Sequence, residues 1–367
     1  MQKGTLSGIQ YQSQPVEHPV GAGEVLGVLE GGALYPVEID PRVDISGPVR
    51  PSLPCVVVGI ALEAPTAAAP AGVDVALCVS GDAIPAGWVA VENPEVELER
   101  VATNIDRFPQ AAVLLTQVLR LGETIGTEEA LLVESLAYSV AQGGAEFATW
   151  LSRRSPSGRD TAGRDTAGRD KVGRDTMGRD TGVQSGPADA VLVERRDDTL
   201  EIVLNRPEVR NALNIEMRDG LVEALGVARA DPSVTRIELR GAGPDFSAGG
   251  DLYEFGTSDS PVTGHLVRTS RNPARLTASV AERLTVHLHG SCIGAGIELA
   301  SFANRVTARA DTRIRLPELT LGLLPGSGGT VSIPRRIGRH RCAWLGLSGA
   351  VIDATRAAEW GLVDEVL

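Results

Sequence analysis

Aromatic residues are scarce in this chain of 367 residues: Phe, Trp and Tyr together make up only 4% of it. Proteins that bind single-stranded nucleic acid commonly stack bases on aromatic rings, so the composition argues against that function. Basic residues are also in deficit, with 35 Lys and Arg against 47 Asp and Glu, a formal net charge of −12. This balance argues against nucleic acid or an anionic membrane as the main partner.

Cysteine is sparse as well, and its spacing excludes the common zinc and redox motifs. The four cysteines form no CxxC pair and have no neighbouring histidine cluster; they are Cys55, Cys78, Cys292 and Cys342. We expect reduced thiols in the core and no metal site, with scattered disulfides as the weaker alternative.

No apolar run is long enough to cross a membrane as a helix. The longest, around Pro54–Ser80, is interrupted by charged residues and prolines. The N-terminal sequence MQKGTLSGIQYQSQPVEHP is polar where a signal peptide has an apolar stretch. These absences predict a soluble cytoplasmic protein.

A short repeat occupies Gly158–Thr181 and reads GRDTA, GRDTA, GRDKV, GRDTM and GRDT. It has too few apolar side chains to offset the entropy of ordering, which predicts a solvated linker over 155–189. Regularly spaced arginines could bind an anion, but an Asp follows every Arg and nearly cancels its charge, so we prefer the linker. Because the length suits two domains, we divide the chain into a poorly patterned segment at 1–54, a segment at 55–154, the linker, and a core at 190–367.

Residues 55–154 change from strand patterns to helix patterns. Short β-branched runs between Pro and Gly predict strands, and apolar residues at helical spacing predict helices, the third with Thr127 as its N-cap. The expected strands are Cys55–Ile60, Val73–Val79 and Trp88–Val91, and the first two helices are Glu95–Arg107 and Ala111–Leu121.

After the linker, strands alternate with helices and glycine-rich turns, which predicts an α/β architecture. The expected elements are a hairpin of Val191–Val193 with Thr199–Asn205, a helix at Ile215–Ala230, and strands at Arg236–Arg240 and Leu284–Leu288.

Two glycine-rich stretches, Gly241–Leu252 and His289–Ala300, are each expected to end a strand and open a helix. Glycine lets a ligand approach the backbone closely, and N–H groups at a helix start are unpaired, so both stretches are candidate sites for an oxyanion or a phosphate. Neither matches the GxGxxG dinucleotide motif or the P-loop motif.

Two glutamates complete the candidate site. Glu298 lies in the helix that the second stretch opens, and Glu318 lies just after the next expected strand. Each is flanked by apolar residues, which favours a raised pKa and proton transfer near neutral pH; a solvated or capping acid is the alternative.

Four motifs, FSAGGDL, GAGIELA, LPELTLGLLPGSGGT and AAEWGLVDEVL, make residues 190–367 resemble the crotonase (enoyl-CoA hydratase/isomerase) superfamily. The resemblance implies a ββα-spiral core, an acyl-CoA substrate with no cofactor besides its coenzyme A, and a homotrimer or hexamer. It also implies that the backbone N–H groups of Gly250 and Ala295 bind the thioester oxygen and stabilise an enolate.

In the family's hydratases, two glutamates occupy the positions of Glu298 and Glu318, one acting on water and the other delivering a proton at the α-carbon. The pair therefore favours an acyl-CoA hydratase/dehydratase. The alternatives are another crotonase reaction (isomerase, thioesterase, decarboxylase or carbon–carbon lyase) and a non-catalytic crotonase-like partner subunit. Ala295 replaces the family's usual Gly, which is tolerable only if its φ is negative.

The same resemblance suggests contacts to the substrate. Ala248 of the FSAGGDL motif and His289 are expected to bind it, with an acid/base role open to His289. A core or edge histidine is the alternative for His289.

Relatives continue past GLVDEV with about three helices that cover the active site, and here Val96–Arg154 resembles those helices, preceded by a degenerate crotonase-like stretch. We therefore expect a rearranged crotonase whose N-terminal helices complete the core at 190–367. Trp150, Arg153 and Arg154 would then lie against coenzyme A, the arginines pairing with its 3′-phosphate or only starting the linker.

Expression of residues 190–367 alone tests this arrangement. Without the N-terminal helices the core would expose an apolar face, so we expect the fragment to be insoluble or inactive by size-exclusion chromatography and an acyl-CoA turnover assay. A soluble, trimeric and active fragment would contradict the rearrangement.

Overall fold

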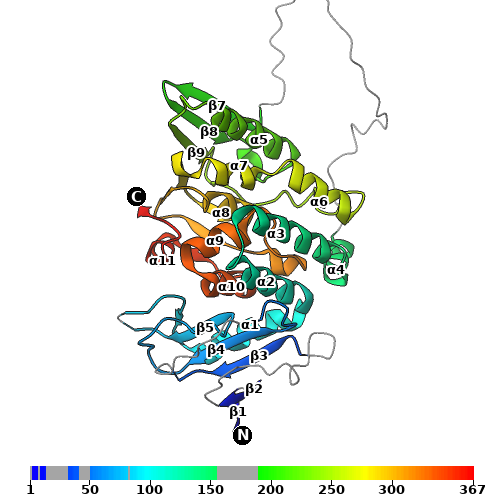
Figure 1. The fold of residues 1–367 in the computed structure, drawn as a ribbon, viewed down its shortest axis with the longest axis vertical. Helices are drawn as coiled ribbons and strands as arrows, with labels where there is room; N and C mark the ends of the chain where they lie inside the picture. Colours follow the sequence, from blue (N-terminus) through cyan, green and yellow to red (C-terminus); the bar gives the residue numbers. More distant parts are fainter. Residues whose placement is uncertain (1, 7–8, 14–31, 41–49, 82, 155–188) are drawn as a thin grey trace, which may run out of the picture.

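The computed structural model describes residues 2–6, 9–13, 32–40, 50–81, 83–154 and 189–367, so nearly all of the predicted linker lies outside the described residues. Figure 1 shows a layered molecule, with a sheet from the N-terminal segment at one end, a sheet from the C-terminal half at the other, and helices from both halves between them. No helix within the described ranges is long and apolar enough to cross a membrane.

The described part of the N-terminal segment forms a six-stranded sheet. Strands β2 to β6 are parallel, and β1 pairs antiparallel with β2. In sheet order the strands are β1 (Gln2–Leu6), β2 (Ile9–Ser13), β3 (Leu34–Glu38), β4 (Val56–Ala61), β5 (Val75–Val79) and β6 (Val89–Val91).

Strands β4, β5 and β6 match the three predicted strands, whereas β1 to β3 were not predicted. Pro36 lies inside β3, and a proline normally argues against a strand because it donates no ladder hydrogen bond. β3 pairs with β4 along its whole length, so the predicted boundary at residue 54 falls inside one sheet.

Residues 94–153 form four helices: α1 (Pro94–Arg107), α2 (Pro109–Gly122), α3 (Thr127–Gln142) and α4 (Ala145–Arg153). Helix α1 begins where its sequence directs, because the Asn93 side chain accepts hydrogen bonds from two amides of the first turn and Pro94 occupies the first position. In α3 the N-cap is Gly126, whose backbone is extended, and Thr127 is already helical. The prediction of Thr127 as the N-cap is therefore wrong by one residue.

The C-terminal half contains a six-stranded sheet, in the order β15-β12-β10-β9-β8-β7, and a small sheet, in the order β11-β13-β14, within the described residues. The large sheet is parallel except for the β7–β8 hairpin. The strands are β7 (Val191–Arg196), β8 (Thr199–Leu204), β9 (Arg236–Gly241), β10 (Leu284–Leu288), β11 (Ser291–Ile293), β12 (Arg305–Ala308), β13 (Arg313–Arg315), β14 (Ile352–Asp353) and β15 (Glu365–Val366).

Helices connect and cover these strands, which confirms the predicted α/β class, the hairpin and the helix at Ile215–Ala230. They are α5 (Ile215–Ala230), α6 (Pro261–Ser270), α7 (Pro273–Ser279), α8 (Ala295–Ala300), α9 (Gly329–Ile337), α10 (Arg339–Ser348) and α11 (Ala354–Trp360), with 3-10 turns η2 (Pro207–Val209), η3 (Ala281–Arg283) and η4 (Glu318–Leu321).

The N-terminal helices pack directly on the C-terminal half. Helices α1 and α2 contact α10, and α2 and α3 contact α9. α2 and α10 approach so closely at Gly346 that a side chain there would overlap Leu115. The Asn104 side chain also donates hydrogen bonds to the last carbonyls of α10. The two halves are therefore parts of one packed unit.

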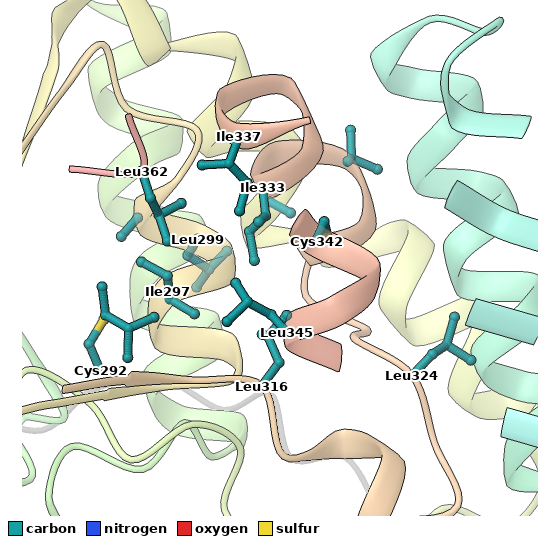
Figure 2. Packing of buried hydrophobic residues seen from close by; sticks show 14 of the residues in the cluster. Cys292, Ile297, Leu299, Leu316, Leu324, Ile333, Ile337, Cys342, Leu345 and Leu362 are labelled. Atoms are coloured by element: carbon teal, nitrogen blue, oxygen red, sulfur yellow. The ribbon is translucent and has the colours of Figure 1, made fainter. Parts of the chain in front are cut away.

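One hydrophobic cluster runs through both halves, from Val56 in β4 to Val363 near the C-terminus. Figure 2 shows its C-terminal part around Ile297, Leu299 and Ile333, with helices of the N-terminal half alongside. The four cysteines are all buried and free, as predicted, which contradicts the disulfide alternative.

A buried ionic network joins the N-terminal sheet to α2 and α10. The Asp74 carboxylate accepts hydrogen bonds from Arg120 at 2.5 and 2.8 Å, from Arg339 at 3.3 Å and from the Val57 amide at 2.8 Å. Asp74, Arg120 and Arg339 are each at most 3% exposed. Because one carboxylate serves two buried guanidinium groups, the network depends on Asp74.

The substitution Asp74→Asn should lower the free energy of unfolding by about 3–5 kcal/mol, because it leaves the buried Arg120 without a carboxylate partner and Arg339 with only the half-exposed Glu123. Urea denaturation measures this change. The matched control is Glu123→Gln, which removes an Arg339 partner whose side chain is 49% exposed and should cost less than about 1 kcal/mol. Equal effects of the two substitutions would show that Asp74 has no special role.

Candidate active site

A cavity of about 440 Å³ lies between α3, α6 and the loops of the C-terminal half. The structure brings all four predicted catalytic residues to its wall: Gly250, Ala295, Glu298 and Glu318. Tyr138 and Gln142 of α3 also line it, so the N-terminal half contributes to the same cavity. Nowhere in the described ranges do three or more His, Cys, Asp or Glu side chains form a group suited to a metal ion.

The backbone amides of Gly250 and Ala295 donate no hydrogen bond to any residue that the structure describes. Their loops touch at Gly249, which has a φ of 89° and where a side chain would overlap the carbonyl oxygen of Ile293. Ala295 is the first residue of α8, and the positive φ falls on Gly294, so Ala295 meets the conformational condition set by the sequence. Two unpaired amides beside one cavity are suited to hold a carbonyl oxygen that gains negative charge.

The first glycine-rich stretch ends in turns and not in a helix, which corrects the prediction. Asp251 accepts a hydrogen bond from the amide of Tyr253 at 3.1 Å, and Gly256 has a φ of 78°, so the chain bends before α6 begins. The bend brings the Phe255 ring against Gly250, where any side chain would overlap it. A larger residue at position 250 would therefore require the Phe255 ring to move.

Glu298 is held by the backbone. It is 2% exposed, and its Oε2 accepts hydrogen bonds from the amides of Ser327 at 2.7 Å and Gly329 at 2.9 Å. These amides lie at the N-terminus of α9, where unpaired N–H groups and the helix dipole favour a negative charge. The side chain is thus fixed in one orientation at the cavity wall.

Glu318 is held less completely. It opens η4 and is 9% exposed, and its Oε1 lies so close to Gly294 that a side chain there would overlap it. Its Oε2 is buried and has no hydrogen-bond partner among the described residues. Buried polar atoms without partners are uncommon, and one at a cavity wall marks a position for a water molecule or a ligand.

Burial changes the acidity of both side chains. It raises the pKa of Glu298 well above the ordinary range, and the nearby charge of Glu318 raises it further. Burial also raises the pKa of Glu318, to about 7. Carboxyl groups with such pKa values exchange protons near neutral pH, as a general acid or base must.

A third glutamate, Glu134 of α3, reaches the same region and carries no family motif. It is 2% exposed, and its carboxylate accepts hydrogen bonds from the amides of Gly328 at 2.7 Å and Thr330 at 2.9 Å. Burial raises the pKa of this carboxyl group to about 7. The sequence does hold one signal for this residue. Glu134 lies four residues after Ala130 and four before Tyr138, so helical spacing places an acid on the buried apolar face of α3.

Trp150 and Arg154 lie behind the cavity wall. The Trp150 ring packs edge-on against Phe255, with centroids 6.2 Å apart. Arg154 donates hydrogen bonds to the carbonyls of Leu252 at 2.5 Å and Phe255 at 3.2 Å, and so supports the turn that carries Phe255. Arg153 is exposed and does not line the cavity. Contact of these residues with coenzyme A stays a prediction.

Ala248 and His289 are not brought to the cavity. Ala248 is half-buried and its amide donates to the carbonyl of Arg210 at 2.8 Å. His289 follows β10 and donates from Nε2 to the carbonyl of Gly243 at 3.1 Å. Gly290, with a φ of 54°, turns the chain here, so His289 occupies the edge position that was its alternative.

The substitution Glu318→Gln should stabilise the fold at neutral and alkaline pH. Because the pKa of Glu318 is raised from 4.5 to about 7, the folded chain retains a proton that the unfolded chain releases, and wild-type stability falls as pH rises through this window. Gln has no proton to lose, so its melting temperature should exceed that of the wild type by roughly 4 °C at pH 8 and by little at pH 5. Scanning fluorimetry would contradict this if the difference did not change with pH.

Comparisons with known proteins agree with this geometry. The family model described as enoyl-CoA hydratase/isomerase matches residues 194–367, which contain both glycine-rich stretches and the predicted glutamate pair. The 2,3-dehydroadipyl-CoA hydratase of Escherichia coli (strain K12) is 38% identical over 176 residues, which cover 48% of this chain and 68% of that protein. The 1,2-epoxyphenylacetyl-CoA isomerase of the same organism is 34% identical over 172 residues, which cover 46% and 66%.

Among solved structures, the crystal structure of an enoyl-CoA hydratase from Thermoplasma volcanium GSS1 matches with 35% identity and a TM-score of 0.46, covering 49% of this chain and 72% of that one. The described architecture, in which helices of the N-terminal half pack on an α/β core, and the family match over that core confirm the predicted fold class. The chain belongs to the crotonase (enoyl-CoA hydratase/isomerase) superfamily.

Proposed function

We propose that this protein adds water across the double bond of an enoyl-CoA thioester and, in reverse, removes water from a 3-hydroxyacyl-CoA. The observation that carries this proposal is the presence of two buried carboxyl groups with raised pKa values, Glu298 and Glu318, on the wall of a cavity that two unpaired amides also line. The similarity to a hydratase of enoyl-CoA type supports it.

In the hydration direction, the amides of Gly250 and Ala295 hold the thioester oxygen. One ionised carboxylate takes a proton from water as the water oxygen bonds to the β-carbon, and the π electrons move to the thioester oxygen. The two N–H donors stabilise this enolate until the other, protonated carboxyl group gives its proton to the α-carbon. One carboxyl group has gained a proton and the other has lost one, so atoms and charge are conserved without a further reagent.

The electrostatics of the pair support this division of roles. Two neighbouring carboxylates in a buried site repel each other, so ionisation of one raises the pKa of the other. Near neutral pH such a pair shares one proton, which provides an acid and a base at the same time.

Isomerisation of an acyl-CoA is the second candidate. The same pair can remove a proton from one carbon and return one to another without water, and one relative is described as a 1,2-epoxyphenylacetyl-CoA isomerase. Hydration is favoured because both glutamates are present and the buried Oε2 of Glu318 is free to contact water.

Mass spectrometry of a panel of enoyl- and 3-hydroxyacyl-CoAs after incubation with the protein tests the function. We expect a product that differs from its substrate by one water molecule, and we expect Glu318→Gln to lower kcat by about 10²- to 10⁴-fold with coenzyme A binding unchanged in calorimetry.

The matched control is Glu208→Gln, at an exposed position of η2, which should retain full turnover. A product of unchanged mass would favour the isomerase. Full turnover by the Glu318→Gln variant would rule out the proposed acid–base pair.

A further inference from the structure

We propose that Glu134 of the N-terminal half is a positioning residue for the reaction: it holds the loop of residues 327–330, whose amides in turn hold Glu298. This inference rests on the proposed function, because it assigns Glu134 a role that acts through Glu298.

Four successive amides are divided between the two carboxylates. Glu298 accepts from residues 327 and 329, at 2.7 and 2.9 Å. Glu134 accepts from residues 328 and 330, at 2.7 and 2.9 Å, and also from the hydroxyl of Thr330 at 2.7 Å. The loop therefore lies between two acids, and each acid fixes alternate N–H groups.

The loop conformation makes this division possible. Gly328 has a φ of 98°, and a side chain there would overlap the ring of Phe302. Gly329 packs against Glu298 just as closely. Because the four amides are consecutive and close contacts confine Gly328 and Gly329, the orientation of the two that bind Glu298 depends on the two that bind Glu134.

The chemistry of the contact requires a carboxylate. All three groups that meet Glu134 are donors, two N–H groups and one O–H group, and only an ionised carboxylate offers acceptors to all of them. A glutamine of the same shape would turn its own NH₂ group toward a donor. The positive charge of Arg268 acts on Glu134, but the Arg268 guanidinium lies over the Tyr138 ring and forms no ion pair with Glu134 in the described residues.

Glu134 comes from a helix that is far from the loop in sequence, 196 positions before Thr330. Helix α3 packs on α6 and α9 and presents Glu134 to the loop. The helices of the N-terminal half therefore do more than cover the core: one of them fixes the loop that orients a proposed catalytic group.

A double-mutant cycle tests the proposal, because a residue that acts only through Glu298 has no effect once Glu298 is disabled. In the full-length protein, Glu134→Gln should lower kcat by about 10- to 100-fold with KM within about threefold. In the Glu298→Gln background the same substitution should lower the residual rate by less than about twofold. An equal loss in both backgrounds, or no loss in the wild type, overturns the proposal.

Two further variants keep the test decisive. Glu129→Gln is the control, since it makes the same change at an exposed position of the same helix and should leave kcat unchanged. If Glu134→Gln does not fold, Thr330→Val replaces it, because it removes only the hydroxyl donor; kcat should fall about threefold in the wild type and stay unchanged in the Glu298→Gln background.

A measurement without turnover separates this proposal from the proposed function. Amide hydrogen exchange followed by NMR should become faster at Ser327 and Gly329 in the Glu134→Gln variant, although Glu134 does not bind these two amides. Unchanged exchange there overturns the positioning role. A wild type that turns over no acyl-CoA would instead refute the proposed function and leave the exchange result to decide the role of Glu134.

Discussion

Burying a carboxylate costs free energy unless hydrogen-bond donors replace the water that it loses. This constraint governs the three buried glutamates beside the cavity. Glu134 and Glu298 meet it with consecutive amides at the start of α9. Glu318 does not, because its Oε2 is buried without a partner among the described residues. Both carboxylate oxygens of Glu134 and Oε2 of Glu298 thus have donors, whereas Oε2 of Glu318 has none among the described residues.

The same requirement explains how the two halves of the chain are joined. Asp74 of the N-terminal half binds both Arg339 of α10 and Arg120. Glu134 accepts hydrogen bonds from the loop at the start of α9. Arg339 and Glu134 each take a buried partner from the other half of the chain. Together with the continuous hydrophobic cluster, this makes the N-terminal half part of the enzyme core and not an appended domain.

Local sequence was sufficient to predict what depends on local backbone geometry. The helix at Ile215–Ala230 and the helix that the second glycine-rich stretch opens both follow from short motifs, and Ala295 meets the φ condition that its sequence set. The positions of Glu298 and Glu318 followed from the family resemblance, whose motifs keep their spacing.

The errors arose where longer-range structure decides. Glu134 escaped prediction because its partners lie almost two hundred residues away, and an acid within an apolar helix face usually has no assigned role. Strand β3 was not predicted because Pro36 argues against a strand, and its pairing with β4 cannot be read from the local sequence. His289 does not line the cavity, and its contact with substrate stays a prediction.

The order of the segments has a consequence for biosynthesis. Helices α1 to α3 leave the ribosome well before α9 and α10, on which they pack, and at about 5–20 residues per second the delay between α3 and α9 is roughly ten to forty seconds. Throughout that interval the apolar faces of the helices lack their final covering, and only the N-terminal sheet is available to shield them. A nascent chain of this design therefore exposes apolar surface for longer than one in which neighbouring elements fold as they emerge.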